Sequence, residues 1–109
     1  MEVETPREFF EKTLPSKFNP DKAANIEAIV QMNITGPAGG NWTVTIRDRK
    51  MAVKEEIHPS PTITIKLADN DFLDIVNGKQ SGIIALMRGR LEFKGSIAVG
   101  MKMMDIGLF

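Results

Sequence analysis

The sequence contains no cysteine and little of several other residue types that carry chemistry. Without cysteine, disulfide frameworks, zinc ribbons and thiol catalysis are excluded. The 109 residues include one histidine, one tryptophan and no tyrosine. Neither sign of charge predominates, because Lys plus Arg and Asp plus Glu both number 14. Nucleic-acid binders usually carry a basic excess, so nucleic acid is not an expected partner.

Long hydrophobic runs are also absent. No apolar stretch approaches the ~20 residues that a membrane-spanning helix needs. The first residues show neither the pattern of a secretory signal nor that of a transit peptide, so a cytoplasmic location is expected. The length predicts a single domain over residues 1–109. Its 42% of hydrophobic residues are enough to fill one core and to line a modest cavity.

The first half of the chain predicts one helix followed by strands. Thr5 to Glu8 has the pattern of a capping box, with Pro6 at the first helical position, and Pro15 is expected to end this helix. From Ile26 the apolar period changes to two, which predicts strands near residues 26–34, 42–47 and 51–55. The third is the most highly charged, which is typical of a sheet edge.

The second half begins with a connection that contains Pro59 and Pro61 and is predicted to cross over the sheet. A strand is expected over residues 62–67, followed by a helix with Asp69 as its N-cap. Ser81 is expected to begin a second short helix, and residues 91–94 alternate as a last strand.

The stretch from Ser96 onward predicts a helix with two apolar faces. One face carries Ile97, Met101, Met104 and Leu108, and the other carries Val99, Met103 and Ile106. An ordinary surface helix has one apolar stripe. This helix therefore needs apolar surroundings on two sides.

Several segments, taken in order, resemble the sterol-carrier-protein family. They are residues 25–36, 42–46 and 63–79, together with the more specific stretch 85–96, in which paired glycines flank a strand. The resemblance implies an α+β fold, with a twisted five-stranded sheet covered on one face by short helices. It also implies an apolar tunnel between sheet and helices, which takes fatty acyl chains, acyl-CoA, sterols or phospholipids. In such proteins the C-terminal segment helps to close the tunnel.

The expected function is non-enzymatic lipid binding and carriage, which requires an apolar cavity and no cofactor. Methionine suits such a cavity, because its flexible side chain adapts to ligands of varying shape. For any one of these apolar residues, packing in an ordinary core is the competing interpretation. The residues expected to bind lipid are Phe72, Ile75, Ile83, Ile84, Met87, Ile97, Met101, Met104 and Leu108.

Charged and reactive residues indicate no catalytic or metal site. His58 lies in an expected loop with no visible nucleophile beside it, and three aspartates near the helix at Asp69 lack the remaining ligands of a calcium loop. The basic groups of residues 47–50 could form one spot with Arg88 and Arg90, suited to an anionic membrane surface or a lipid head group. An interaction or oligomerisation module that uses the C-terminal apolar surface is the alternative function. A transient membrane contact, a partner enzyme and a weak homodimer are left open as partners.

Overall fold

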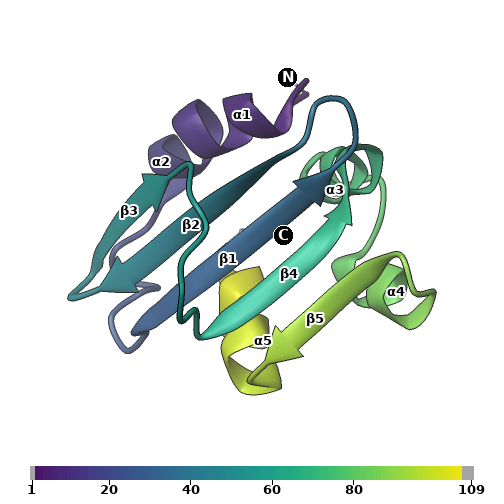
Figure 1. Cartoon of the computed structure of the whole chain (residues 1–109). Helices are drawn as coiled ribbons and strands as arrows, with labels where there is room; N and C mark the ends of the chain where they lie inside the picture. Colours follow the sequence, from purple (N-terminus) through teal and green to yellow (C-terminus); the bar gives the residue numbers. More distant parts are fainter. Residues whose placement is uncertain (1, 107–109) are drawn as a thin grey trace.

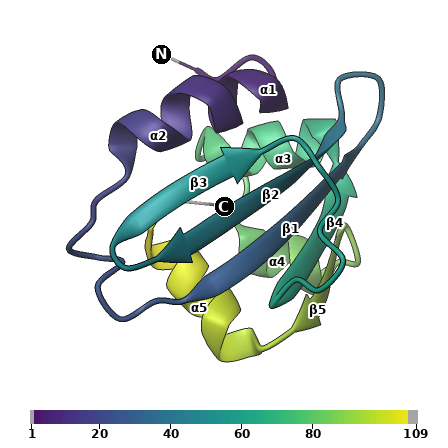
Figure 2. The ribbon, with the colours of Figure 1, turned by 60° about the vertical axis from the view of Figure 1, so that its left-hand side comes forward.

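A five-stranded mixed sheet forms the frame of the computed structural model, which describes residues 2–106. Figure 2 shows the strands in the order β3-β2-β1-β4-β5. The central strand β1 is antiparallel to β2 and parallel to β4, which makes the connection from β3 to β4 a crossover. The sheet is open, with edges at β3 and β5, and the predicted fold class and strands are confirmed. The strands are β1 (Ala28–Thr35), β2 (Gly40–Arg47), β3 (Lys50–Lys54), β4 (Ile63–Ala68) and β5 (Leu91–Gly95).

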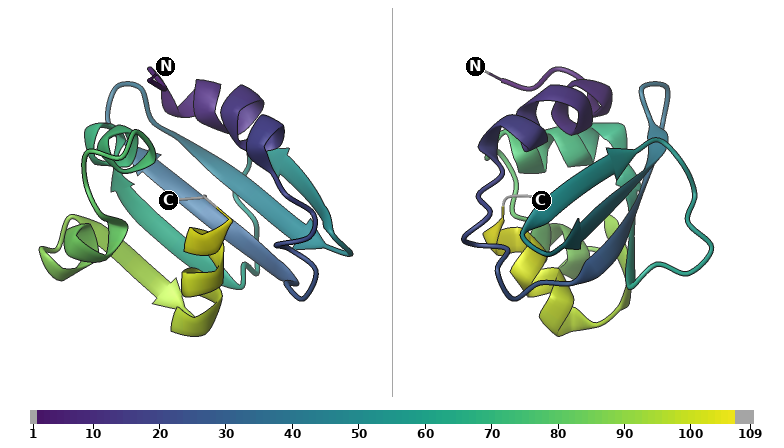
Figure 3. Two further views of the ribbon diagram at one scale, coloured as in Figure 1. Left: turned by 180° about the vertical axis from the view of Figure 1, so that it is seen from behind. Right: turned by 90° about the vertical axis from the view of Figure 1, so that its left-hand side faces the viewer.

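The helices cover one face of this sheet (Figure 3). The N-terminal helical run lies towards the β3 side, whereas the C-terminal helices lie towards the β5 side (Figures 1 and 3). None of the helices in residues 2–106 is long and apolar enough to cross a membrane. They are α1 (Pro6–Glu8), the π-helical segment η1 (Phe9–Thr13), α2 (Leu14–Lys17), α3 (Asp69–Val76), α4 (Gly82–Met87) and α5 (Ile97–Asp105).

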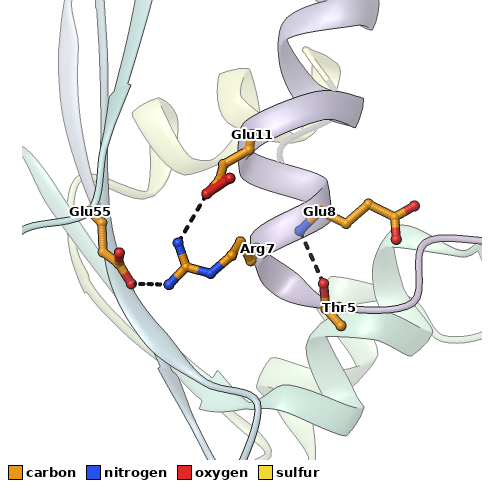
Figure 4. A network of polar contacts seen from close by, with 5 residues as sticks. All are labelled: Thr5, Arg7, Glu8, Glu11 and Glu55. Atoms are coloured by element: carbon orange, nitrogen blue, oxygen red, sulfur yellow. Dashed lines mark hydrogen bonds and ion pairs between the residues drawn. The ribbon is translucent and has the colours of Figure 1, made fainter.

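The N-terminal helix begins as the sequence predicts. The Glu8 backbone N–H donates to Oγ1 of Thr5 over 3.1 Å, and Pro6 occupies the first helical position. Arg7 then bridges Glu11, at 3.0 Å, and Glu55, at 2.7 Å (Figure 4). The second of these contacts links the helix to the segment just after β3.

The prediction that Pro15 ends this helix is wrong. Proline lacks an N–H, and its ring clashes with the carbonyl four residues earlier in a regular α-helix. Here the preceding turn is π-helical, with the Leu14 N–H bonded to the carbonyl of Phe9, five residues back. The wider turn accommodates the ring, and helical structure continues to Lys17.

The boundary at Asp69 also differs from expectation. Ala68 is the N-cap residue of α3, and Asp69 is the first helical position. The Asp69 carboxylate accepts hydrogen bonds from the N–H of Ala38, at 3.0 Å, and of Asn70, at 2.8 Å. It thereby ties the start of α3 to the β1–β2 turn.

The opposite face of the sheet is polar and is crossed by the loop between β3 and β4 (Figure 1). Gln31 and Thr43 are buried beneath that loop. The Gln31 amide donates to the carbonyl of Glu56 over 3.0 Å and accepts from the N–H of His58 over 2.8 Å. These hydrogen bonds satisfy buried polar groups of Gln31. The crossover predicted at Pro59 and Pro61 is confirmed by the strand order.

Candidate functional site

An apolar groove of about 220 Å³ lies between α4, β5 and α5. In Figure 1, α4 lies near the start of β5 and α5 near its end. Among the described residues, the lining consists of apolar side chains and glycines, with no polar or charged side chain. It is formed by Gly82, Ile83, Leu86, Leu91, Phe93, Ile97, Gly100, Met101 and Met104.

Helix α4 forms one wall, and its composition is unusual for a surface helix. Its six residues GIIALM are all apolar. Residues three apart in a helix share a face, so the helix presents three pairs. Gly82 and Ala85 are buried against the body of the protein, and Ile83 and Leu86 line the groove. The third pair, residues 84 and 87, lies outside the lining.

Helix α5 forms the opposite wall and confirms the prediction of two apolar faces. Met103 and Ile106 are buried in the core, and Val99 packs against it. Ile97 and Met101 are 69% and 60% exposed and line the groove on the other side of the helix. One face therefore holds the helix on the sheet and leaves the other free for the groove.

The predicted lipid-binding residues do not all lie at this groove. Ile83, Ile97, Met101 and Met104 line it. Ile84 and Met87 are on α4 but face away from the lining, and Leu108 lies outside the described residues. Phe72 and Ile75 are buried in the core instead, so the structure places them away from the groove.

Phe72 belongs to an aromatic cluster that accounts for its position. Its ring stacks on Phe10 at a centroid separation of 5.3 Å, and Phe10 stacks in turn on Trp42 at 5.1 Å. Phe9 meets the edges of the rings of Phe10 and Phe72. Two of these rings, Phe9 and Phe10, belong to the N-terminal helical run. Phe72 therefore packs against that run and helps to hold it on the sheet.

The sequence reasoning missed five lining residues, namely Gly82, Leu86, Leu91, Phe93 and Gly100. Leu91 and Phe93 alternate with charged residues in β5, which indicates that they share one face of the strand. That signal was available, but it did not reveal that the face meets α4 and α5. The glycines gave no signal, because only the packing of the helices shows which backbone is exposed to the groove.

Charge lies around the groove and not in it. The larger pKa shifts occur at other sites: hydrogen bonding to Glu55 raises the pKa of Arg7, and hydrogen bonding to Glu2 raises the pKa of Lys79. Burial lowers the pKa of Lys17. With no titratable group among the described lining residues, the groove can bind apolar matter but offers no acid, base or nucleophile.

The suggested cluster of basic residues does not form. Arg47 ends β2 and Arg49 lies in the β2–β3 turn, near the β3 edge of the sheet, where they pair with Glu27 and Asp21 at 3.7 and 3.6 Å. Arg90 lies between α4 and β5, at the other edge. The strand order therefore puts Arg47 and Arg49 near one edge of the sheet and Arg90 at the other, an arrangement that the sequence alone does not reveal.

Curated proteins with related sequences are longer than this chain. Hydroxysteroid dehydrogenase-like protein 2 from Xenopus laevis is 25% identical over 96 residues, which cover 87% of this chain and 23% of the relative. Sterol carrier protein 2 from Homo sapiens is 31% identical over 75 residues, which cover 67% of this chain and 14% of the relative. The chain therefore spans about a quarter of these relatives or less.

Solved structures share the fold. The palmitated SCP2L2 protein of Aedes aegypti superimposes with a TM-score of 0.72 at 22% identity, over 100% of this chain and 96% of that one. The sec-alkylsulfatase Pisa1 from a Pseudomonas species superimposes with a TM-score of 0.79 at 20% identity, over 95% of this chain but only 16% of the enzyme. A model of the SCP-2 sterol transfer family matches residues 8–106. The chain belongs to the SCP-2 sterol transfer family, a membership that points to lipid binding or transfer.

Proposed function

We propose that this chain binds lipids non-enzymatically, by enclosing part of one alkyl chain in the groove between α4, β5 and α5. The observation that carries the proposal is the lining, in which every described side chain is apolar. Each methylene that leaves water contributes ~0.8 kcal/mol, so eight methylenes would contribute about 6 kcal/mol. A chain can therefore be held there without a polar contact.

The size of the groove favours a linear chain over a fused ring system. A cavity of about 150 Å³ accepts benzene, with its six carbons. In the same proportion, 220 Å³ would hold about nine carbons, which is a segment of an acyl chain and much less than a sterol. The head group then lies outside the groove, and fatty acids, acyl-CoA and phospholipids can share this mode of binding. Carriage in a closed tunnel would require movement of α4 or α5.

Replacing Met101 with lysine tests the proposal. Met101 lines the groove and is 60% exposed, so a lysine there places a charge beside the bound chain without disturbing the core. We expect Met101→Lys to lower the affinity for a fluorescent fatty acid at least about tenfold, because desolvating an unpaired charge is costly. The melting temperature should change little.

Ile57→Lys is the matched control. Ile57 is 68% exposed, but it lies in the loop over the opposite face of the sheet. The control protein should bind the fatty acid as the unmodified chain does. Equal affinities of Met101→Lys and the unmodified protein would refute the groove as the binding site.

A further inference from the structure

Lipid binding in the groove leaves one apolar face of α4 unexplained. Ile84 and Met87 point away from the lining, with exposed fractions of 46% and 80%. A helix that is apolar on all sides is usually buried or in contact with lipid. This one lies on the protein surface, and Met87 on its outer face is the most exposed of its residues at 80%.

Basic residues outnumber acidic ones in the stretch of sequence that contains this face, although the whole sequence is neutral. Residues 75–104 contain the basic residues Lys79, Arg88, Arg90, Lys94 and Lys102 and a single acidic residue, Glu92. This segment therefore carries a net charge of +4, and the rest of the chain carries −4. The groove and the outer face of α4 both belong to the basic part.

Arg88 and Arg90 immediately follow the exposed apolar pair. Nη1 of Arg90 lies 3.3 Å from the Asp71 carboxylate, which partly neutralises it. Arg88 is exposed and forms no ion pair within residues 2–106. Exposed apolar side chains beside cationic ones are the combination that binds the interface of an anionic membrane.

We propose that the outer face of α4, formed by Ile84 and Met87 and continued by Arg88, docks on the surface of a bilayer that contains anionic phospholipids. The inference rests on the proposed function and extends it, because Ile83 and Leu86 on the same helix line the groove. Docking brings that wall of the groove to the membrane interface, so an alkyl chain can pass between bilayer and groove with little exposure to water.

The charge pattern argues against a second copy of the chain as the occupant. In a two-fold symmetric dimer the same patch meets itself. Arg88 of one copy would then approach the same patch of the other, and like charges in contact oppose association. An anionic bilayer instead supplies negative charge for Arg88 and an apolar interior for Ile84 and Met87.

Sedimentation with vesicles tests the docking. One set contains phosphatidylcholine alone, and the other contains equimolar phosphatidylcholine and phosphatidylglycerol. We expect the unmodified protein to bind the phosphatidylglycerol vesicles more tightly. Met87→Glu should lower this binding at least about tenfold, because it removes apolar insertion and adds repulsion. Arg88→Gln should lower it about fivefold on the anionic vesicles only.

Ile57→Glu again serves as the control, because it replaces an isoleucine that is 68% exposed and distant from α4. It should bind vesicles as the unmodified protein does. Equal binding to both vesicle types, or equal effects of Met87→Glu and Ile57→Glu, would overturn the proposal. So would a dimer in light scattering that Met87→Glu dissociates, since the face would then be a protein interface.

Fatty-acid titration without vesicles separates this inference from the proposed function. Met87 does not line the groove, so Met87→Glu should keep the affinity for a free fatty acid. If the unmodified protein binds anionic vesicles through this face but takes up no fatty acid, the proposed function fails and the docking stands. If it takes up fatty acid but Met87→Glu leaves vesicle binding unchanged, the docking fails alone.

Discussion

At Gly100 the absence of a side chain determines the shape of the groove. A Cβ atom added at this position would lie 2.7 Å from Cε2 of Phe93, closer than carbon atoms can approach. The neighbour is the far end of a ring and not backbone, so the ring can move in response. Gly100 therefore lets α5 pack against β5 while Phe93 lines the groove.

Gly100→Ala should reduce ligand binding without unfolding the protein. Alanine favours a helix by about 1 kcal/mol over glycine, which offsets part of the cost of moving the Phe93 ring. If the displaced ring occupies the space of one or two methylenes, affinity for a fatty acid falls about 4- to 15-fold. Isothermal titration calorimetry measures the affinity, and thermal melting checks the fold.

Ala98→Leu is the matched variant for that experiment. Ala98 is exposed on the same helix and is outside the lining, so added bulk there should leave the affinity unchanged. A larger loss of affinity in Ala98→Leu than in Gly100→Ala would contradict the assigned role of Gly100.

At the scale of the element, α5 separates stability from binding on its two faces. Met103→Ala should lower the free energy of unfolding by about 2–5 kcal/mol, because a fully buried methionine leaves a cavity. Met101→Ala should change it by less than about 1 kcal/mol, because Met101 is largely exposed. Urea denaturation of both variants measures the difference.

The affinity for a fatty acid should respond in the opposite way, with a larger loss in Met101→Ala than in Met103→Ala. Met101→Ala is expected to weaken binding severalfold, since it removes groove lining, while folded Met103→Ala retains its affinity. If both substitutions lowered stability and affinity together, α5 would not have two separate roles.

Element by element, the sequence predicted local structure better than the arrangement of the site. The two faces of α5 were readable because its apolar residues follow the helical period. Pro15 misled, because nothing in the sequence reveals that a π-helical turn precedes it and makes room for its ring. The sequence assigns Phe72 to the cavity, because a phenylalanine on a helix gives the same apolar pattern whether it meets a ligand or, as here, the rings of Phe9 and Phe10.

At the scale of the whole molecule, the aromatic cluster and the groove lie in different parts of the sheet face. Phe9, Phe10, Trp42 and Phe72 anchor the N-terminal helix towards the β3 side, whereas the groove lies over β5. The strand order β3-β2-β1-β4-β5 produces this separation. The separation depends on the crossover after β3, which the sequence indicates. It also depends on how the helices pack on the sheet, which the sequence does not indicate.

The separation predicts that a bound chain adds to stability without being required for folding. A ligand present at 100 times its dissociation constant stabilises the folded state by about 2.7 kcal/mol. Palmitate should therefore raise the melting temperature of the unmodified protein by several degrees. Met101→Lys should melt near the unliganded temperature and show no such increase. If palmitate leaves the melting temperature of the unmodified protein unchanged, the expected stabilisation by a bound chain is contradicted.

Binding of an alkyl chain in the groove can be located by a methyl NMR titration with palmitate, using protein labelled at the methyl groups of isoleucine and methionine. We expect saturable shifts at Ile83, Ile97, Met101 and Met104, because these residues line the groove. Ile57 on the opposite face and Met32 in the core should stay unchanged. Shifts centred on Ile57 or spread evenly over all methyl groups would contradict binding in the groove.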